Sequence, residues 1–206
     1  MKIQIKKSIK PVDYNKAMSF IDKRLKDIRE NKHKELIWLL EHKNVYTAGT
    51  SSTKDEIIDK KINIVKTNRG GKITFHGPGQ IIFYFIINLN KRKKDIRWFL
   101  NCIERSIINT LKSYKINTYS DKKNIGIWTN HNNKEKKIAS IGIKVSKWYA
   151  YHGYALNVNV DKEKFKKIIP CGIKNKEIVN LSDIKKKKFI NLKDNLIKNF
   201  ILNLKN

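Results

Sequence analysis

Short apolar runs alternate along the chain with longer stretches in which apolar residues recur every three or four positions. The short runs are typical of β-strands, and the longer spacing is typical of amphipathic helices. In the first half of the chain we expect two helices, over residues 13–31 and 95–115, each with one apolar face. We expect strands over residues 2–7, 35–40, 45–48, 62–67, 72–76 and 80–89.

The second half continues the same alternation. We expect strands over residues 124–129, 137–146 and 151–160, a short helix that Asp161 caps, and a final helix over residues 191–204. Hairpin-like strand pairs and long crossover helices both occur, which favours an α/β (α+β) fold with a mixed β-sheet flanked by helices. No repeat or long linker divides the chain, so we expect one domain over residues 1–206.

The composition is that of a globular protein, with 206 residues of which 40% are hydrophobic. The most apolar run, residues 81–89, has the length of a strand and is too short to cross a bilayer. The basic N-terminus is not followed by the apolar core of a signal peptide. We therefore expect a cytoplasmic protein that does not bind membranes, and we take it to be a monomer.

The formal net charge of +28 raises the alternative of a nucleic-acid-binding module. Lysine, however, is frequent along the whole chain, and its longest run, residues 185–188, has no interleaved aromatic residues. This pattern favours a generally basic, solvated surface over a dedicated nucleic-acid site. Such a surface would also help an acidic protein partner to dock.

Residues 69–80 combine four glycines, one proline, Arg69 and His76. Glycines let backbone N–H groups approach a ligand closely, although glycine and proline alone are more often found in ordinary tight turns. Because Arg69 and His76 bracket the turns, we interpret the segment as part of a site. It does not match the nucleotide-binding fingerprints.

Lys137 begins the strand expected over residues 137–146, whose start is apolar, and burial there would lower the pKa of its ammonium group. An exposed lysine beside Lys136 is the simpler reading of these residues alone. A second segment, residues 152–157, begins with His152 and carries a glycine, an alanine and an asparagine.

The two cysteines differ in their surroundings. Cys102 falls on the apolar face of an expected helix and fits a small core residue. Cys171 lies between a proline and a glycine, where the chain turns and can present a thiol. A thiol needs a neighbouring cation or base to be mostly thiolate at neutral pH, and His76, His152 and Lys137 are all candidates. The residues alone do not choose among them. No Cys/His spacing indicates a metal site.

Taken together, four motifs resemble those of the lipoyl(octanoyl) transferases. They are Arg-Gly-Gly-x-x-Thr-aromatic-His-Gly-Pro-Gly-Gln at residues 69–80, Lys-Ile-x-x-Ile-Gly at 137–142, His-Gly-x-Ala-Leu-Asn at 152–157 and Pro-Cys-Gly-Ile at 170–173. The resemblance implies the fold of the biotin and lipoate protein ligase catalytic domains. It also implies that Cys171 is the acyl-accepting nucleophile and that Lys137, rather than a histidine, lowers its pKa and shuttles the proton.

The resemblance further implies an acyl-binding site and its partners. The donor would be octanoyl-acyl carrier protein, and the acceptors would be lipoyl domains of 2-oxoacid dehydrogenase E2 subunits and the glycine cleavage H protein, without ATP or a metal. The main alternative is an ATP-dependent lipoate or biotin protein ligase, which would not need Cys171. The binding residues implied are Arg69, Gly70, Gly71, Lys72, Ile73, Thr74, Phe75, His76, Ser140, Ile141, Gly142, Gly153, Tyr154 and Ala155.

Overall fold

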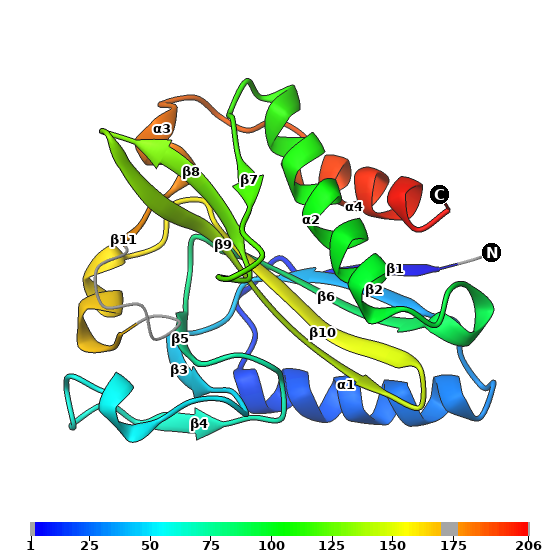
Figure 1. Ribbon diagram of the computed structural model, residues 1–206. Coiled ribbons are helices and arrows are strands. Elements are labelled where there is room, and N and C mark those ends of the chain that lie inside the picture. The colour runs from blue at the N-terminus through cyan, green and yellow to red at the C-terminus, as the bar shows by residue number, and fades with distance from the viewer. Residues whose placement is uncertain (1–2, 170–176, 206) are drawn as a thin grey trace.

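The computed structural model describes residues 3–169 and 177–205. Their strands form two β-sheets, and helices pack beside them (Figure 1). The helices are α1 Tyr14–Arg29, α2 Ile96–Ser113, α3 Leu181–Ile184 and α4 Leu192–Asn203, with 3-10 turns η1 Lys54–Glu56, η2 Leu89–Lys91 and η3 Lys162–Lys167. The strands are β1 Gln4–Lys7, β2 Leu36–Leu40, β3 Val45–Ala48, β4 Ile64–Lys66, β5 Ile73–His76, β6 Gln80–Asn88, β7 Tyr119–Ser120, β8 Ile127–His131, β9 Lys134–Ser146, β10 Tyr149–Asn157 and β11 Glu177–Ile178.

The larger sheet is mixed. Its strand order is β1-β2-β6-β10-β9-β8-β7, and β11 pairs with β9 beside this path. The pairs β1/β2 and β9/β11 are parallel, and the other pairs are antiparallel. A smaller sheet of order β4-β3-β5 stands at one end of the larger one (Figure 1). The expected mixed sheet flanked by helices is therefore confirmed.

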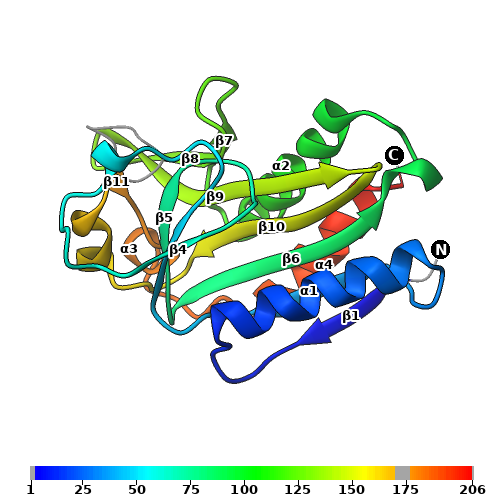
Figure 2. The ribbon, with the colours of Figure 1, turned by 90° about the horizontal axis from the view of Figure 1, so that it is seen from below.

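Helices cover both faces of the larger sheet (Figure 2). On one face α1 buries Ala17, Ile21 and Leu25 against β2, β6 and β10. On the other face α2 and α4 enclose the main core. Asp13 and Asp95 cap α1 and α2, since their side chains accept hydrogen bonds from backbone N–H groups in the first turn. Apolar stripes at helical spacing thus decide which helix face meets the sheet.

Two tight hairpins explain where the long strands begin. Asn132 and Asn133 both have positive φ and turn β8 into β9, so β9 starts at Lys134, three residues earlier than expected. Lys147 and Trp148 also have positive φ, and β10 starts directly after them. The short elements β7, β11 and α3 were not expected, because two to four residues carry too little periodicity to predict them.

No helix within residues 3–169 and 177–205 combines the length and the apolar character that a membrane crossing requires.

Candidate active site

A cavity of about 540 Å³ lies against β9 and β10. Its lining comes from β5, β6, β9 and β10, from the loops after β3 and before β5 and β8, and from the first turns of α2. It contains Lys137 and every predicted binding residue except Ile73 and Phe75. The three motifs that fall in the described part of the chain, separate in sequence, therefore meet at one cavity.

The sheet supplies one wall of this cavity. Directly paired residues of antiparallel strands lie on the same face of a sheet. Two rows of paired residues consequently cross β6, β10 and β9: Tyr84, Gly153 and Gly142, then Ile82, Ala155 and Ser140. The β6 residues are large and those of β10 and β9 are small, which leaves room above the latter two strands. A side chain at Gly153 would stand 1.8 Å from the Phe83 carbonyl oxygen, so the close strand approach requires glycine there.

The turn at residues 69–71 closes another side. β8 pairs with β9 only as far as Ala139, and beyond it the Gly70 N–H donates to the Ile143 carbonyl at 3.1 Å. A β-carbon at Gly142 would lie 2.9 Å from the Gly70 oxygen, so the glycine lets this turn rest on β9.

Arg69 is buried and anchors the same turn. Its guanidinium donates to the Thr47 carbonyl at 2.9 Å, to Thr47 Oγ1 at 2.8 Å and to the Gly70 carbonyl at 3.0 Å. These bonds tie the glycine-rich turn to β3. The fork of donors on arginine suits this bridging task.

Strand alternation divides the predicted residues of β5 into two sets. Thr74 and His76 line the cavity, whereas Ile73 and Phe75 point to the opposite side, because successive side chains of a strand face opposite ways. Ile73 and Phe75 pack in a small second core with Phe165. The structure therefore does not bring these two side chains to the cavity.

Lys137 is 4% exposed and lines the cavity. Its Nζ donates to the Ile125 carbonyl at 3.0 Å and stands 4.7 Å from the centre of the Trp128 ring. Gly126, with φ of 144°, lies against the same side chain. Lys137 is therefore a buried lysine held at the cavity, not an exposed loop lysine.

Three buried histidines stand in or behind the cavity. Burial lowers the pKa of His76 and His152 to about 3 each and that of His42 to about 4; Arg69 contributes at the first two. His42 donates through Nδ1 to the Val12 carbonyl and accepts at Nε2 from the Tyr84 hydroxyl at 2.8 Å. All three rings are therefore neutral at pH 7.

Of the two cysteines, the structure describes only Cys102. Cys171 and its motif lie outside the described residues. Cys102 lies on α2, buried, with its thiol donating to the Asn203 carbonyl at 3.2 Å. Burial raises the pKa of the Cys102 thiol to about 11, so this sulfur is a poor nucleophile at neutral pH.

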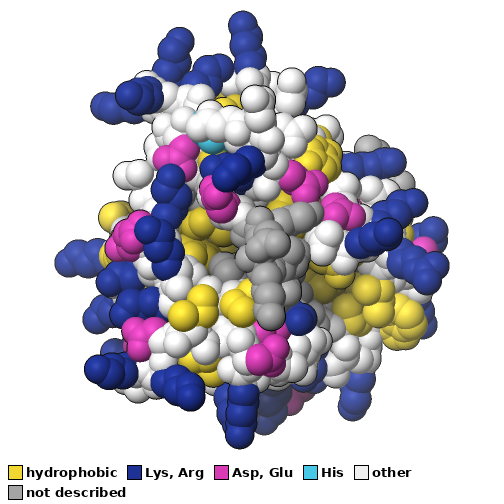
Figure 3. Space-filling view, turned by 60° about the vertical axis from the view of Figure 1, so that its left-hand side comes forward, with side chains coloured by type: hydrophobic (Ala, Val, Ile, Leu, Met, Phe, Trp, Pro, Cys, Tyr) yellow, Lys and Arg dark blue, Asp and Glu magenta, His cyan; other side chains and the backbone are white. Residues whose placement is uncertain are grey.

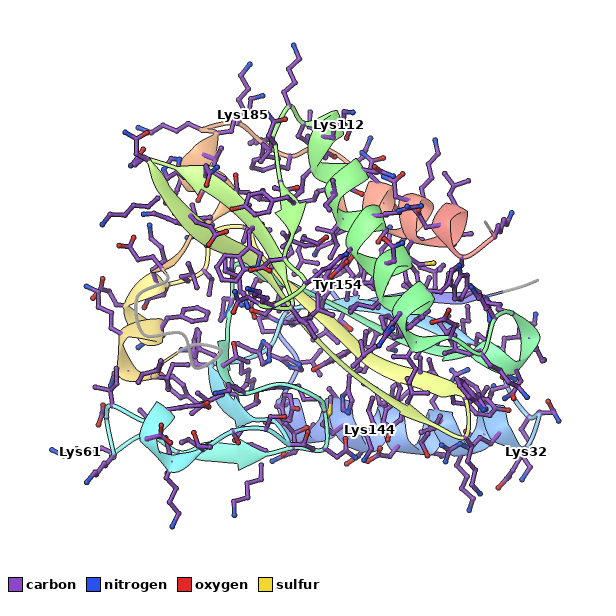
Figure 4. The ribbon with its side chains drawn as sticks, in the orientation of Figure 1. Lys32, Lys61, Lys112, Lys144, Tyr154 and Lys185 are labelled. Carbon is purple, nitrogen blue, oxygen red and sulfur yellow. The ribbon has the colours of Figure 1, made fainter. Side chains whose placement is uncertain are left out.

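Several lining residues had no motif to mark them. Ile82 and Tyr84 belong to the apolar strand β6, and Ile96 and Leu100 stand one turn apart on α2. Their spacing predicts buried faces but not which face meets a cavity. Tyr154, labelled near the middle of the molecule in Figure 4, was anticipated; it is buried and stacks on Phe83 with ring centres 4.8 Å apart.

Comparisons with known proteins identify the family of the chain. The lipoyl protein ligase A/B catalytic domain family matches residues 13–201. The octanoyltransferase of Wolbachia sp. subsp. Brugia malayi is 43% identical over 188 residues, 91% of this chain and 92% of that protein.

Solved structures share the fold at low identity. The putative lipoate protein ligase Ta0514 from T. acidophilum with bound lipoic acid has a TM-score of 0.76 at 16% identity, covering 100% of this chain and 87% of that chain. The biotin protein ligase from Aquifex aeolicus in complex with biotin and ATP has a TM-score of 0.58 at 17% identity, covering 98% and 70%. On the family match and the sequence identity together, the chain belongs to the octanoyltransferases, acyltransferases that share the lipoyl protein ligase A/B catalytic domain.

Proposed function

We propose that the protein transfers an octanoyl group from acyl carrier protein, through a thioester on Cys171, to a lysine of lipoyl domains. The acceptors would be lipoyl domains of 2-oxoacid dehydrogenase E2 subunits and the glycine cleavage H protein. The observation that carries this proposal is the meeting of three motif segments, one of which begins with Lys137, at one cavity.

The cavity suits a medium-length acyl chain. Its volume of about 540 Å³ falls within the usual range of small-ligand sites. Ile82, Ile141 and Ala155 contribute apolar wall near the polar groups of Lys137 and Ser140. Burying the six or so methylenes of an octanoyl chain at ~0.8 kcal/mol each would contribute roughly 5 kcal/mol to binding.

The chemistry would take two steps. The Cys171 thiolate attacks the carrier thioester carbon and forms a new C–S bond. The C–S bond to the carrier breaks, and the carrier sulfur takes a proton from Lys137 and leaves as a thiol. The acceptor amine then attacks the acyl-enzyme, the C–N bond forms, the C–S bond breaks, and the amine's proton returns to the enzyme. The acyl group is already activated as a thioester, so neither step requires ATP.

The surface charge favours acidic partners. Lys and Arg side chains project around the whole of the face in Figure 3, consistent with the net charge of +28. Opposite charge speeds the encounter of two proteins and does so less at high salt. Acidic carrier and lipoyl domains would benefit from it.

Intact-protein mass spectrometry after mixing with octanoyl-carrier protein, without ATP, tests the proposal. We expect the mass to rise by one octanoyl group that peptide mapping places on Cys171, and the group to leave when a lipoyl domain is added. Cys171→Ala should gain no mass, while Cys102→Ala, the matched control, should load normally. Transfer that requires ATP and survives Cys171→Ala would instead support the ligase mechanism.

A further inference from the structure

A chain of hydrogen bonds fixes which nitrogen of His76 carries the proton. His76 Nδ1 lies 2.7 Å from Gln80 Oε1, and Gln80 Nε2 lies 2.8 Å from Asn157 Oδ1 and 3.5 Å from the Phe75 carbonyl. A backbone carbonyl can only accept, so the amide nitrogen of Gln80 faces Phe75 and its oxygen faces His76. His76 therefore donates through Nδ1, and its Nε2 is an unprotonated acceptor.

The other cavity-lining histidine offers no such atom. His152 Nε2 is 2.6 Å from Asn68 Oδ1, which leaves Nδ1 as its second ring nitrogen. That Nδ1 is covered by protein and has no hydrogen-bond partner among the described residues. His76 is thus the imidazole whose second nitrogen can meet a molecule in the cavity.

The charges around the cavity favour a neutral amine over an ammonium. Arg69, Lys72 and Lys123 line it, and no Asp or Glu is among its described lining residues. Lys72 pairs with the Glu56 carboxylate at 2.8 Å, and Lys137 has given up its proton in the loading step, so Arg69 and Lys123 carry this effect. Nearby positive charge disfavours a further cation, so a lysine entering here loses its proton more readily. A neutral amine then needs an acceptor for an N–H bond, while its lone pair points at the carbon it attacks.

We propose that His76 positions the acceptor lysine in the second transfer step, with Nε2 accepting one amine N–H. This inference rests on the proposed function, because it assigns a role within that reaction. The amine nitrogen forms the C–N bond to the acyl carbon, the C–S bond breaks, and the amine's surplus proton goes to the departing thiolate of Cys171. His76 takes up no proton overall, and Gln80 and Asn157 keep its acceptor nitrogen towards the cavity.

His76→Asn is the direct test. An asparagine amide nitrogen takes the place of Nδ1 and keeps the bond to Gln80, but it provides no atom at Nε2. Transfer from the purified acyl-enzyme to a lipoyl domain should slow on the order of 10²-fold, well beyond any slowing of the loading of Cys171 by octanoyl-carrier protein. His33→Asn, at an exposed histidine, is the matched control and should alter neither rate.

Gln80→Glu supplies a second readout. A carboxylate against Nδ1 favours the imidazolium, whose Nε2 is protonated and cannot accept. The transfer step in this variant should therefore lose rate as the pH falls, with its acid limb at a higher pH than in wild type. Tyr14, His42 and Arg69 also face the ring. The positive charge of Arg69 disfavours the imidazolium and so limits how far the acid limb moves.

The outcomes separate the inference from the proposed function. If wild-type protein forms no acyl-enzyme, the proposed function itself fails. If the acyl-enzyme forms but His76→Asn slows neither step, or slows loading as much as transfer, only the role of His76 is overturned. Should His76→Asn not fold, as judged by circular dichroism, the pH profile of Gln80→Glu decides, and a profile that matches wild type refutes the role.

Discussion

Gly126 and Lys137 are fitted to one another. A β-carbon on Gly126 would stand 2.9 Å from Lys137 Cε and 3.1 Å from Nζ, closer than side-chain carbons normally approach. The lysine therefore reaches its place between the Ile125 carbonyl and the Trp128 ring only because residue 126 has no side chain.

Gly126→Ala should consequently displace Lys137. The φ of 144° at this position adds backbone strain for any other residue. We expect loading of Cys171 to slow by about tenfold to a hundredfold, since misplacement of a reacting group by about 1 Å has effects of that order. Stopped-flow or quenched-flow measurement of acyl-enzyme formation checks this. A wild-type loading rate would mean that the position of Lys137 does not matter.

Lys137→Met should leave the fold intact and slow the loading step. Methionine fills the buried stem of the lysine but removes the charge that would favour the Cys171 thiolate. We expect a loss on the order of 10²-fold at pH 7 that becomes smaller as the pH rises, because the thiol then ionises unaided. Lys134→Met, at an exposed lysine of the same strand, is the control. A pH-independent defect would contradict the proposed role.

The cavity wall should set acyl-chain length. Ala155→Leu fills space above β10, and Leu100→Ala opens space beside α2, so the two variants should shift the preference in opposite directions. Each methylene buried or lost is worth ~0.8 kcal/mol, about fourfold in rate. Loading rates with hexanoyl-, octanoyl- and decanoyl-carrier protein measure the shift. A shift of the chain-length preference in the same direction in both variants would show that these residues do not limit the length of the acyl chain.

Stability should fall on mild acidification. His42, His76 and His152 have folded-state pKa values of about 4, 3 and 3, below the 6.5 of a free histidine. At a pH between the folded-state and free pKa values, the unfolded chain binds more protons than the folded chain. The free energy of unfolding is therefore greatest above pH 6.5 and declines as the pH falls. At ~1.4 kcal/mol per pH unit, each histidine should remove about 2 kcal/mol by pH 5.

Urea unfolding between pH 7.5 and pH 5 at constant salt measures this decline. Replacing His42 with Gln should reduce the decline in the free energy of unfolding by roughly the contribution of one histidine. The variant nevertheless starts from a lower stability at pH 7.5. A free energy of unfolding that stays level down to pH 5 would show that the three rings titrate normally.

The sequence alone indicated the type of fold, the placement of the long helices and strands, and the family. These features depend on local periodicity and on motifs whose residues are close in the chain, such as the glycine-rich segment at residues 69–80. It also indicated Lys137 as the partner of Cys171, but through resemblance, because local pattern favoured an exposed lysine.

Only the tertiary structure decided which side chains share the cavity. Ile73 and Phe75 fall inside a motif, yet strand alternation turns them into a separate core. Tyr84 carries no motif, yet its register opposite Gly153 makes it part of the wall. Gly126 likewise becomes meaningful only once Lys137 lies against it. Which side chains are buried, which tautomer a histidine adopts and which residues touch all depend on residues far apart in the chain. Sheet register and packing bring those residues together, and periodicity cannot specify either.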